Sequence, residues 1–203
     1  MPGSDPEHSH LPRLDPSRYR GFAYVHWTMT LRDRARGWLS DACHLRFREL
    51  LLHSAARYHA VCPVYCLMPD HFHLLLLGWR DDSDQLKLTR HFRRHLNAAL
   101  REISSSSASE KSKPFQLQKQ AYDSVLRDKD RARNAFEKVA FYIAENPVRA
   151  KLVSDPSEWT FTGAVIPGYP ELEWGRSDYW DRFWRLHYSR IPEGLQPPID
   201  SRR

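Results

Sequence analysis

The sequence is poor in cysteine and contains no long apolar run. Its three cysteines, Cys43, Cys62 and Cys66, form no framework pattern, and Cys62-x-x-x-Cys66 has no second pair that would complete a zinc site. We therefore expect reduced, partly buried thiols rather than disulfides. Residues 1–20 contain no apolar signal segment, and no stretch approaches the roughly 18 consecutive apolar residues that cross a bilayer. These absences predict a soluble, cytoplasmic protein.

Acidic residues are outnumbered by basic ones. Lys and Arg total 31 against 25 Asp and Glu, which gives a net charge of +6. The arginines gather in two groups, Arg90, Arg93 and Arg94, and Arg127, Arg131 and Arg133. Such clusters favour a polyanion such as nucleic acid as the partner, although many solvated helix faces carry arginine only for solubility.

Apolar periodicity predicts alternating strands and helices. In chain order we expect a strand at 22–31, a helix at 40–58, a strand at 61–68, a turn at Pro69-Asp70, a strand at 71–78, a helix at 83–102, a strand at 121–126, and a helix from Asp128 or Asp130 to about Asn146, ended by Pro147. This order favours an α+β fold, an antiparallel sheet with helices packed on one face. The leucine-rich strand at 71–78 is also compatible with burial on both faces.

Composition divides the chain further. Residues 1–19 are rich in proline and are expected to form a disordered tail, and 191–203 a flexible one. A polar run at about 104–113 predicts a mobile linker inside the main domain, residues 20–153. Residues 154–190 form a Trp-rich C-terminal extension, which we expect to wrap the core or to form a short helix near 178–188.

The most informative motif is His71-Phe72-His73, which directly follows Pro69-Asp70. Because side chains alternate along a strand, both imidazoles should project from one face while Phe72 points into the core. Two adjacent imidazoles on a rigid sheet can hold a divalent metal. Two surface histidines that bind no metal are the alternative, because a chain with eleven histidines forms such pairs easily.

A second motif lies near the end of the last predicted helix of the main domain. Tyr142 and Asn146 are at positions i and i+4 and should share one helix face. A tyrosine can attack phosphorus and form a covalent intermediate, and an amide oxygen can complete a hard-metal site with two imidazoles. Alternatively, Tyr142 is a core aromatic residue and Asn146 an ordinary helix-terminal residue.

Three co-linear stretches give the chain a resemblance to a known family. They are Tyr65-x-Leu-Met-Pro-Asp-His-Phe-His, then Phe115-Gln116 with Tyr122-Asp123-Ser124-Val125-Leu126-Arg127, and Tyr142-Ile143-x-x-Asn146-Pro147-Val148-Arg149-Ala150. Together they resemble the REP-associated tyrosine transposases, which are single-tyrosine HUH (His-hydrophobic-His) transposases of the insertion-sequence type. The likeness runs from about Arg20 to Val153 and continues in Trp159-Thr160-Phe161-Thr162.

By position, the resemblance implies a ferredoxin-like antiparallel sheet that carries the reactive groups. His71 and His73 would be metal ligands, and Tyr142 would be the nucleophile on a neighbouring helix. Asn146 takes the place of the third ligand, which is glutamine in related insertion-sequence transposases. Glu145 lies about 100° round the helix from Asn146 and could replace it only if the helix end frays.

The second motif both matches and departs from the family pattern. Members often carry histidine after the aspartate, where this chain has Ser124, a change that concerns local packing or DNA contact. Asp123 is expected to orient a neighbour or cap the third helix, and Arg127 to reach phosphate. A structural salt bridge between Asp123 and Arg127 is the alternative.

The implied activity is cleavage and rejoining of single-stranded DNA. With Mg²⁺ or Mn²⁺ bound, Tyr142 would attack the scissile phosphate and form a 5′-phosphotyrosine, so that no ATP is needed, which agrees with the absence of a G-x-x-x-x-G-K-[ST] motif. The partner would be hairpin-forming DNA, read by basic residues such as Arg90, Arg93, Arg94 and Arg127. The protein would act as a monomer or homodimer.

Two other functions remain open at this point. A domesticated DNA-binding protein would keep the fold and charge without cleavage. A metal-dependent hydrolase would use water as its nucleophile and would not need Tyr142.

Overall fold

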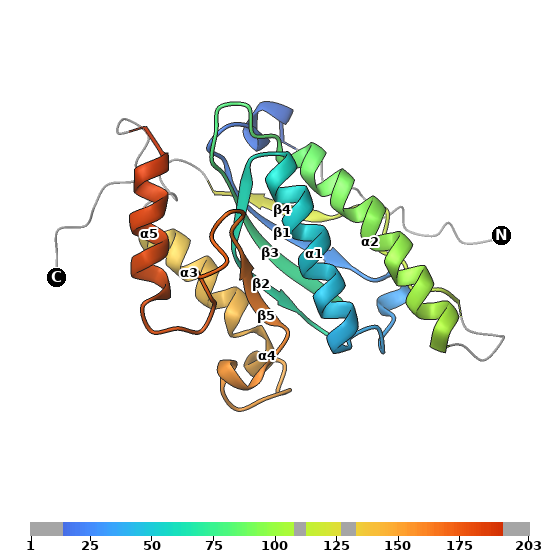
Figure 1. The fold of residues 1–203 in the computed structure, drawn as a ribbon. Helices are drawn as coiled ribbons and strands as arrows, with labels where there is room; N and C mark the ends of the chain where they lie inside the picture. The colour runs from blue at the N-terminus through green and yellow to red at the C-terminus, as the bar shows by residue number, and fades with distance from the viewer. Residues whose placement is uncertain (1–13, 108–112, 127–132, 193–203) are drawn as a thin grey trace, which may run out of the picture.

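The computed structural model describes residues 14–107, 113–126 and 133–192. In chain order the elements are β1 (Tyr24–Thr30), α1 (Asp41–Arg57), β2 (Ala60–Leu67), β3 (His71–Gly78), α2 (Gln85–Ser107), β4 (Tyr122–Val125), α3 (Arg133–Ala144), α4 (Asn146–Arg149), β5 (Thr162–Val165) and α5 (Tyr179–Arg190), with short 3₁₀ helices at Pro16–Tyr19, Arg32–Arg34 and Pro156–Glu158. Figure 1 shows their arrangement.

All strands belong to one antiparallel sheet of order β4-β1-β3-β2-β5. The run from β1 to β4 follows the order strand, helix, strand, strand, helix, strand, and places its strands as β4-β1-β3-β2, which is the ferredoxin-like topology. The expected α+β fold is therefore confirmed. The β2–β3 hairpin turns at Pro69-Asp70 as predicted, with Leu67 opposite Phe72.

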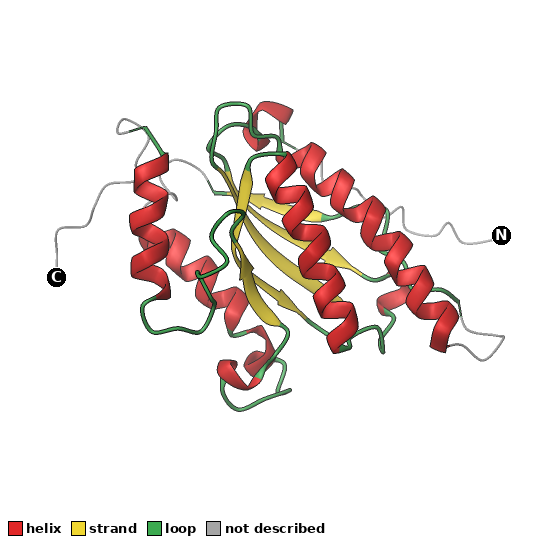
Figure 2. Ribbon diagram, viewed as in Figure 1, coloured by secondary structure: helices red, strands yellow, loops and turns green. Residues whose placement is uncertain are grey.

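Helices cover both faces of the sheet, which corrects the expectation that they lie on one (Figure 2). Helices α1 and α2 cover one face and α3 and α5 the other. The prediction was wrong because it did not take into account that the central strands are buried on both faces. Every residue of β2 is buried, and so is every residue of β3 except His71. Strands buried on both faces need a helical layer on each side.

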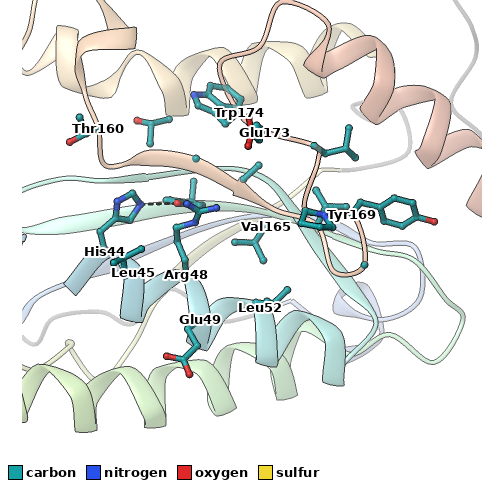
Figure 3. Close-up of a pocket in the computed structure, with 18 residues that line it drawn as sticks. His44, Leu45, Arg48, Glu49, Leu52, Thr160, Val165, Tyr169, Glu173 and Trp174 are labelled. Carbon is teal, nitrogen blue, oxygen red and sulfur yellow. Dashed lines mark hydrogen bonds between the residues drawn. The ribbon is translucent and has the colours of Figure 1, made fainter. Parts of the chain in front are cut away.

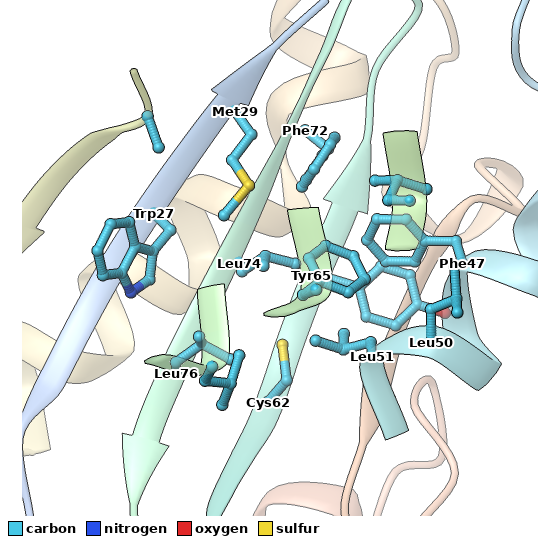
Figure 4. Close-up of a cluster of buried hydrophobic side chains, with 14 of the residues drawn as sticks. Trp27, Met29, Phe47, Leu50, Leu51, Cys62, Tyr65, Phe72, Leu74 and Leu76 are labelled. Atoms are coloured by element: carbon cyan, nitrogen blue, oxygen red, sulfur yellow. The ribbon is translucent and has the colours of Figure 1, made fainter. Parts of the chain in front are cut away.

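The larger of the two described hydrophobic clusters lies between the sheet and helices α1 and α2 and is rich in aromatic residues (Figure 4). Alternate residues of β1 and β3, such as Trp27, Phe72 and Leu74, point into it and are completely buried. The ring of Phe47 on α1 lies edge-on to that of Phe92 on α2, with centroids 5.1 Å apart. The intervening residues of the same strands point to the α3/α5 face, where the predicted site residues lie.

Three segment boundaries differ from the expectation. Tyr19 lies within the predicted disordered tail, yet it is fully buried and its hydroxyl donates to the carboxylate of Asp123. Helix α2 continues through 104–107, part of the predicted linker, because the Ser104 hydroxyl donates to the Leu100 carbonyl and accepts from the Phe115 amide. Ile191 is buried rather than part of a loose tail. The described part of the predicted N-terminal tail also includes the 3₁₀ helix Pro16–Tyr19, whereas residues 1–13, 108–112 and 193–203 lie outside the described ranges.

The Trp-rich segment is an integral part of the fold. The helix expected near 178–188 is confirmed as α5, which packs on α3 through the rings of Phe136 and Trp184, 4.7 Å apart. Strand β5, which pairs with β2 at the sheet edge, was not predicted, because a four-residue strand has too little pattern to detect. The described helices include none that is long and apolar enough for a membrane span.

His187 connects α5 to the sheet from a fully buried position. The indole N–H of Trp79 donates to its Nδ1 at 3.3 Å, so the proton of the neutral ring is on Nε2, which lies 2.5 Å from the Tyr24 hydroxyl. Burial lowers the pKa of His187 to about 3. The folded protein therefore excludes a proton that the unfolded chain binds below about pH 6.5.

We predict that His187→Gln makes stability less sensitive to acid. Since the folded-state pKa is depressed, the contribution of His187 is complete above about pH 6.5 and is lost as the pH falls toward 3. Between pH 6 and 4 the free energy of unfolding of the wild type should fall by about 1.4 kcal/mol per pH unit more than that of the variant. Urea unfolding at several pH values measures this difference, and parallel curves for the two proteins would contradict the assignment.

Candidate active site

His71 and His73 lie side by side on the α3/α5 face of β3. His73 stands opposite Thr28 of β1 and Cys66 of β2, and Phe72 between the two histidines points into the opposite core. The two imidazole rings are perpendicular, with centroids 4.9 Å apart, and their Nε2 atoms are 3.2 Å apart. The same nitrogen of each ring therefore faces a common point.

Asp70 determines the tautomer of His71. Its carboxylate receives a hydrogen bond from Arg34 at 3.1 Å and lies 2.7 Å from Nδ1 of His71. Burial opposes ionisation, but the hydrogen bonds from His71 and Arg34 lower the pKa of Asp70 below its ordinary value. Because an ionised carboxylate only accepts hydrogen bonds, Nδ1 of His71 carries the proton, and the neutral ring presents a lone pair at Nε2.

His73 is held from its other side by β1. Its Nδ1 lies 3.0 Å from the Thr28 hydroxyl and 3.1 Å from Nε2 of His26. Burial, together with the neighbouring His26 and His71, lowers the pKa of His73 to about 3, and burial lowers that of His26 to about 4. Both rings are thus neutral near pH 7, and a neutral ring is the form that can ligate a metal.

Helix α3 brings Tyr142 against the histidines within a single chain. The Tyr142 ring lies edge-on to those of His73 and His26, with centroid distances of 5.9 and 6.0 Å. Its side chain is 39% exposed, so a large substrate can reach it. The guanidinium of Arg149 lies over the same ring, 5.1 Å from its centroid. The phenol of Tyr142, a pair of imidazoles and the guanidinium of Arg149 therefore lie together at one surface.

Asn146 does not continue α3 as the spacing predicted. Helix α3 ends at Ala144, and Asn146 begins the short helix α4, in which Pro147 occupies the first turn rather than ending a helix. Proline is favoured there because its missing N–H has no partner at that position in any case. The side-chain amide of Asn146 donates to the Tyr142 carbonyl at 2.7 Å and so caps the end of α3. Its amide oxygen is the atom left for a metal, and its role as third ligand stays a prediction.

The imidazole pair fits the divalent metal that the resemblance implies. Two nitrogens that each lie about 2.1 Å from one ion are about 3.0 Å apart at an octahedral angle and about 3.4 Å apart at a tetrahedral one. The observed 3.2 Å falls between these values. His26 would not bind the same ion, because it faces the other nitrogen of His73. With His26 excluded, two imidazoles remain, and the described part of the chain contains no group of three or more His, Cys, Asp or Glu residues arranged to hold a metal.

Three of the four predicted DNA-binding arginines lie on α2, in the other layer. Arg90 and Arg94 are exposed on α2, beside a hollow of about 360 Å³ that Lys119 also lines. Arg93 instead has a structural contact, because its guanidinium donates to the carbonyls of Gln118 and, at 2.8 Å, Lys119. Arg127 lies outside the described residues.

Three residues near the site were not singled out by the sequence. His26 and Thr28 contact His73 from β1, and Arg149 covers Tyr142. The alternation of the first predicted strand offered a signal for His26 and Thr28, but only its register with β3 shows that they meet His73. Ser124, the departure from the family pattern, lies opposite His26 in the β1–β4 pairing.

A pocket of about 720 Å³ lies elsewhere, between α1 and β5 (Figure 3). His44 reaches across it to the Tyr65 hydroxyl at 2.8 Å. Arg48 lines it together with Glu49 and Glu173, so its charges favour no single class of ligand. None of the described residues that line it belongs to the histidine–tyrosine cluster.

No protein-family model matches the chain. A curated protein of Haemophilus influenzae, named "Putative REP-associated tyrosine transposase", is 26% identical over 157 residues, which cover 73% of this chain and 85% of that protein. A solved structure of a REP-associated tyrosine transposase bound to a REP hairpin matches with a TM-score of 0.59 at 16% identity, covering 96% of this chain and 94% of that one. The fold is therefore that of a REP-associated tyrosine transposase, and the resemblance found in the motifs is confirmed.

Proposed function

We propose that this protein is a metal-dependent transposase that cuts and rejoins single-stranded, hairpin-forming DNA through a 5′-phosphotyrosine. The observation that carries the proposal is the contact of the Tyr142 ring with His73, whose Nε2 faces that of His71. A nucleophile and a metal-ligand pair from separate elements meet at an exposed surface. The similar protein of Haemophilus influenzae and the hairpin-bound structure agree with this function.

In the proposed reaction, His71 and His73, with Asn146, would hold Mg²⁺ or Mn²⁺, which would supply Lewis-acid catalysis at a non-bridging oxygen of the scissile phosphate. The Tyr142 oxygen loses its proton and attacks phosphorus, the new O–P bond replaces the bond to the 3′ oxygen, and that oxygen takes up a proton. Rejoining is the reverse, with the 3′ hydroxyl attacking the phosphotyrosine. Because the link retains the energy of the broken bond, no nucleotide is consumed.

Arg149 has a position that suits the phosphate. Its exposed guanidinium lies over the Tyr142 ring, where the attacked phosphate would approach. Guanidinium groups bind phosphate oxygens through paired hydrogen bonds. Arg149 would thus orient the scissile group above the nucleophile. The turn at Asn146-Pro147 brings it there, since α4 begins a new helix axis after α3.

The positive charge and the positions of the exposed arginines support a hairpin as the DNA partner. The exposed Arg90 and Arg94 on α2 are positioned to contact the backbone of a folded hairpin rather than the scissile phosphate, because α2 and Tyr142 lie on opposite faces of the sheet. A hairpin partner also agrees with the net charge of +6.

We predict that Tyr142→Phe abolishes a covalent protein–DNA adduct while DNA binding persists, because only the phenolic oxygen is removed. Labelled hairpin-bearing single strands incubated with Mn²⁺ and run on a denaturing gel should give a shifted band with the wild type, and none with the variant or with EDTA. Tyr58→Phe is a matched control, since Tyr58, at the end of α1, contacts His91 on the opposite layer and should leave adduct formation unchanged.

Two outcomes of this experiment would contradict the proposal. Binding without an adduct in both the wild type and Tyr142→Phe would identify a DNA-binding protein that no longer cuts. Cleavage without a protein-linked product, equal in both proteins, would identify a hydrolase that uses water.

We also predict that His71→Ala and His73→Ala each weaken Mn²⁺ binding strongly. The loss of a residue that only hydrogen-bonds to a metal ligand costs roughly 10- to 100-fold in affinity, and the loss of a ligand itself should cost more. Electron paramagnetic resonance of free Mn²⁺ measures the affinity directly. His53→Ala is the control, because His53 is an exposed histidine of α1 on the opposite layer. Equal Mn²⁺ affinity in all four proteins would eliminate the proposed metal site.

Replacement of both Arg90 and Arg94 by Ala should weaken hairpin binding at low salt. The negative slope of the logarithm of the binding constant against the logarithm of salt concentration should become less steep by about two, since each phosphate contact contributes about one. Fluorescence anisotropy at several salt concentrations measures the slope. Arg46→Ala is a suitable control, because Arg46 pairs with Glu49 at 2.6 Å. A slope unchanged by the double substitution would show that α2 does not contact the DNA.

A further inference from the structure

Helix α3 covers the α3/α5 face of the sheet unevenly, because it packs mainly on β2 and β3. Beside it, several residues of β1 and β4 that point to this face are half-buried or exposed. They are His26, Thr28 and Thr30 of β1 and Tyr122 and Ser124 of β4, and we call them the open strip. The open strip is thus a polar surface of the sheet that adjoins the histidine pair.

Tyr122 lies in register with the histidine pair. It stands opposite Thr28 of β1, which in turn stands opposite His73 of β3. Directly paired residues project to the same face, so the Tyr122 ring rises from the face that carries the site. Neighbouring strands are roughly 4.8 Å apart, which places the backbone of Tyr122 about 10 Å from that of His73. A base next to a phosphate held at Tyr142 can therefore reach it.

The Tyr122 ring is available to a ligand. Tyr122 is 59% exposed, and within the described part of the chain no ring contact or side-chain hydrogen bond of this residue is found. By contrast, Tyr24, which points to the same face from β1, is buried and lies edge-on to the ring of Phe136 on α3. Tyr122 therefore presents a flat aromatic surface that the packing of the sheet does not use.

The open strip suits an unpaired nucleic-acid strand. None of its residues carries a carboxylate, so phosphates that pass over it meet no negative charge from the strip itself. Exposed aromatic rings bind single strands by stacking on their bases, with little preference for one base. The Tyr142 ring contacts His26 of the strip edge-on. The strip thus adjoins the point at which the proposed reaction holds the scissile strand.

We propose that Tyr122 is a substrate-binding residue that stacks on an unpaired base near the scissile phosphate. The stacked base holds the single strand across the open strip and so keeps the phosphate in front of Tyr142. This inference rests on the proposed function for its ligand, DNA with single-stranded segments, but not on metal binding or on cleavage.

Two DNA probes of equal charge separate base stacking from phosphate binding. Both contain the same hairpin with a single-stranded extension on each side, made of thymidine nucleotides in one probe and of abasic nucleotides in the other. Fluorescence anisotropy in the presence of EDTA, which removes divalent metal, measures both affinities. The wild type should bind the thymidine probe more tightly than the abasic probe, because only the thymidine probe offers bases for stacking.

Two substitutions of Tyr122 then test the ring. Tyr122→Leu keeps an apolar side chain but removes the aromatic surface, and it should bind the thymidine probe about 5- to 150-fold more weakly than the wild type. Its affinity for the abasic probe should equal that of the wild type, because no charge is lost. Tyr122→Phe is the matched control, since it keeps the ring and should bind both probes as the wild type does.

Three results would overturn the inference. The first is equal wild-type affinity for the two probes, which needs no variant to fold. The second is a Tyr122→Leu protein that is weakened equally for both probes or for neither, and the third is a Tyr122→Phe protein as weak as Tyr122→Leu. If neither probe binds at all, the proposed function fails together with this inference. If the probes bind but no covalent adduct forms in Mn²⁺, only the proposed cleavage fails, and the comparison of the two probes still decides the role of Tyr122.

Discussion

The convergence of two imidazole lone pairs is the constraint on which the site depends. Nε2 of His71 and Nε2 of His73 lie 3.2 Å apart, with the opposite nitrogen of each ring already engaged by Asp70 or by β1. Two lone pairs that face each other in a largely buried setting repel unless a proton or a cation lies between them. In the metal-free protein the single proton of neutral His73 can lie between the two Nε2 atoms, and a divalent metal ion would take its place.

The sheet makes this arrangement rigid. Strand β3 is central, paired on both sides, and its residues point alternately into a helical layer on each face. Helix α3 lies over the histidine face, with Phe136 and Ile143 buried and Tyr142 directed to the site. The C-terminal helix α5 packs on α3, so the segment after the family-like region helps to hold the nucleophile. Substitutions at this helix–helix contact should therefore affect the position of Tyr142.

Much of this could be predicted from local patterns. The two-residue period predicts that His71 and His73 share a face, the helical pattern predicts α1 and α2, and the element order predicts the antiparallel sheet. The rest depends on long-range pairing. The proximity of His26 to His73 requires the register of β1 with β3, and the division of helices between two faces requires knowing what covers β2 and β3. The break between α3 and α4 depends on the Asn146 amide, whose bond to the Tyr142 carbonyl competes with a continuous helix.

Anomalous X-ray diffraction from crystals containing Mn²⁺ tests the central claim most directly. The account predicts one ion within coordination distance, about 2.0 to 2.3 Å, of Nε2 of both His71 and His73, on the side of the sheet that Tyr142 faces. An ion bound through other residues, or a well-ordered site that holds no manganese while a shared proton links the two rings, would contradict it.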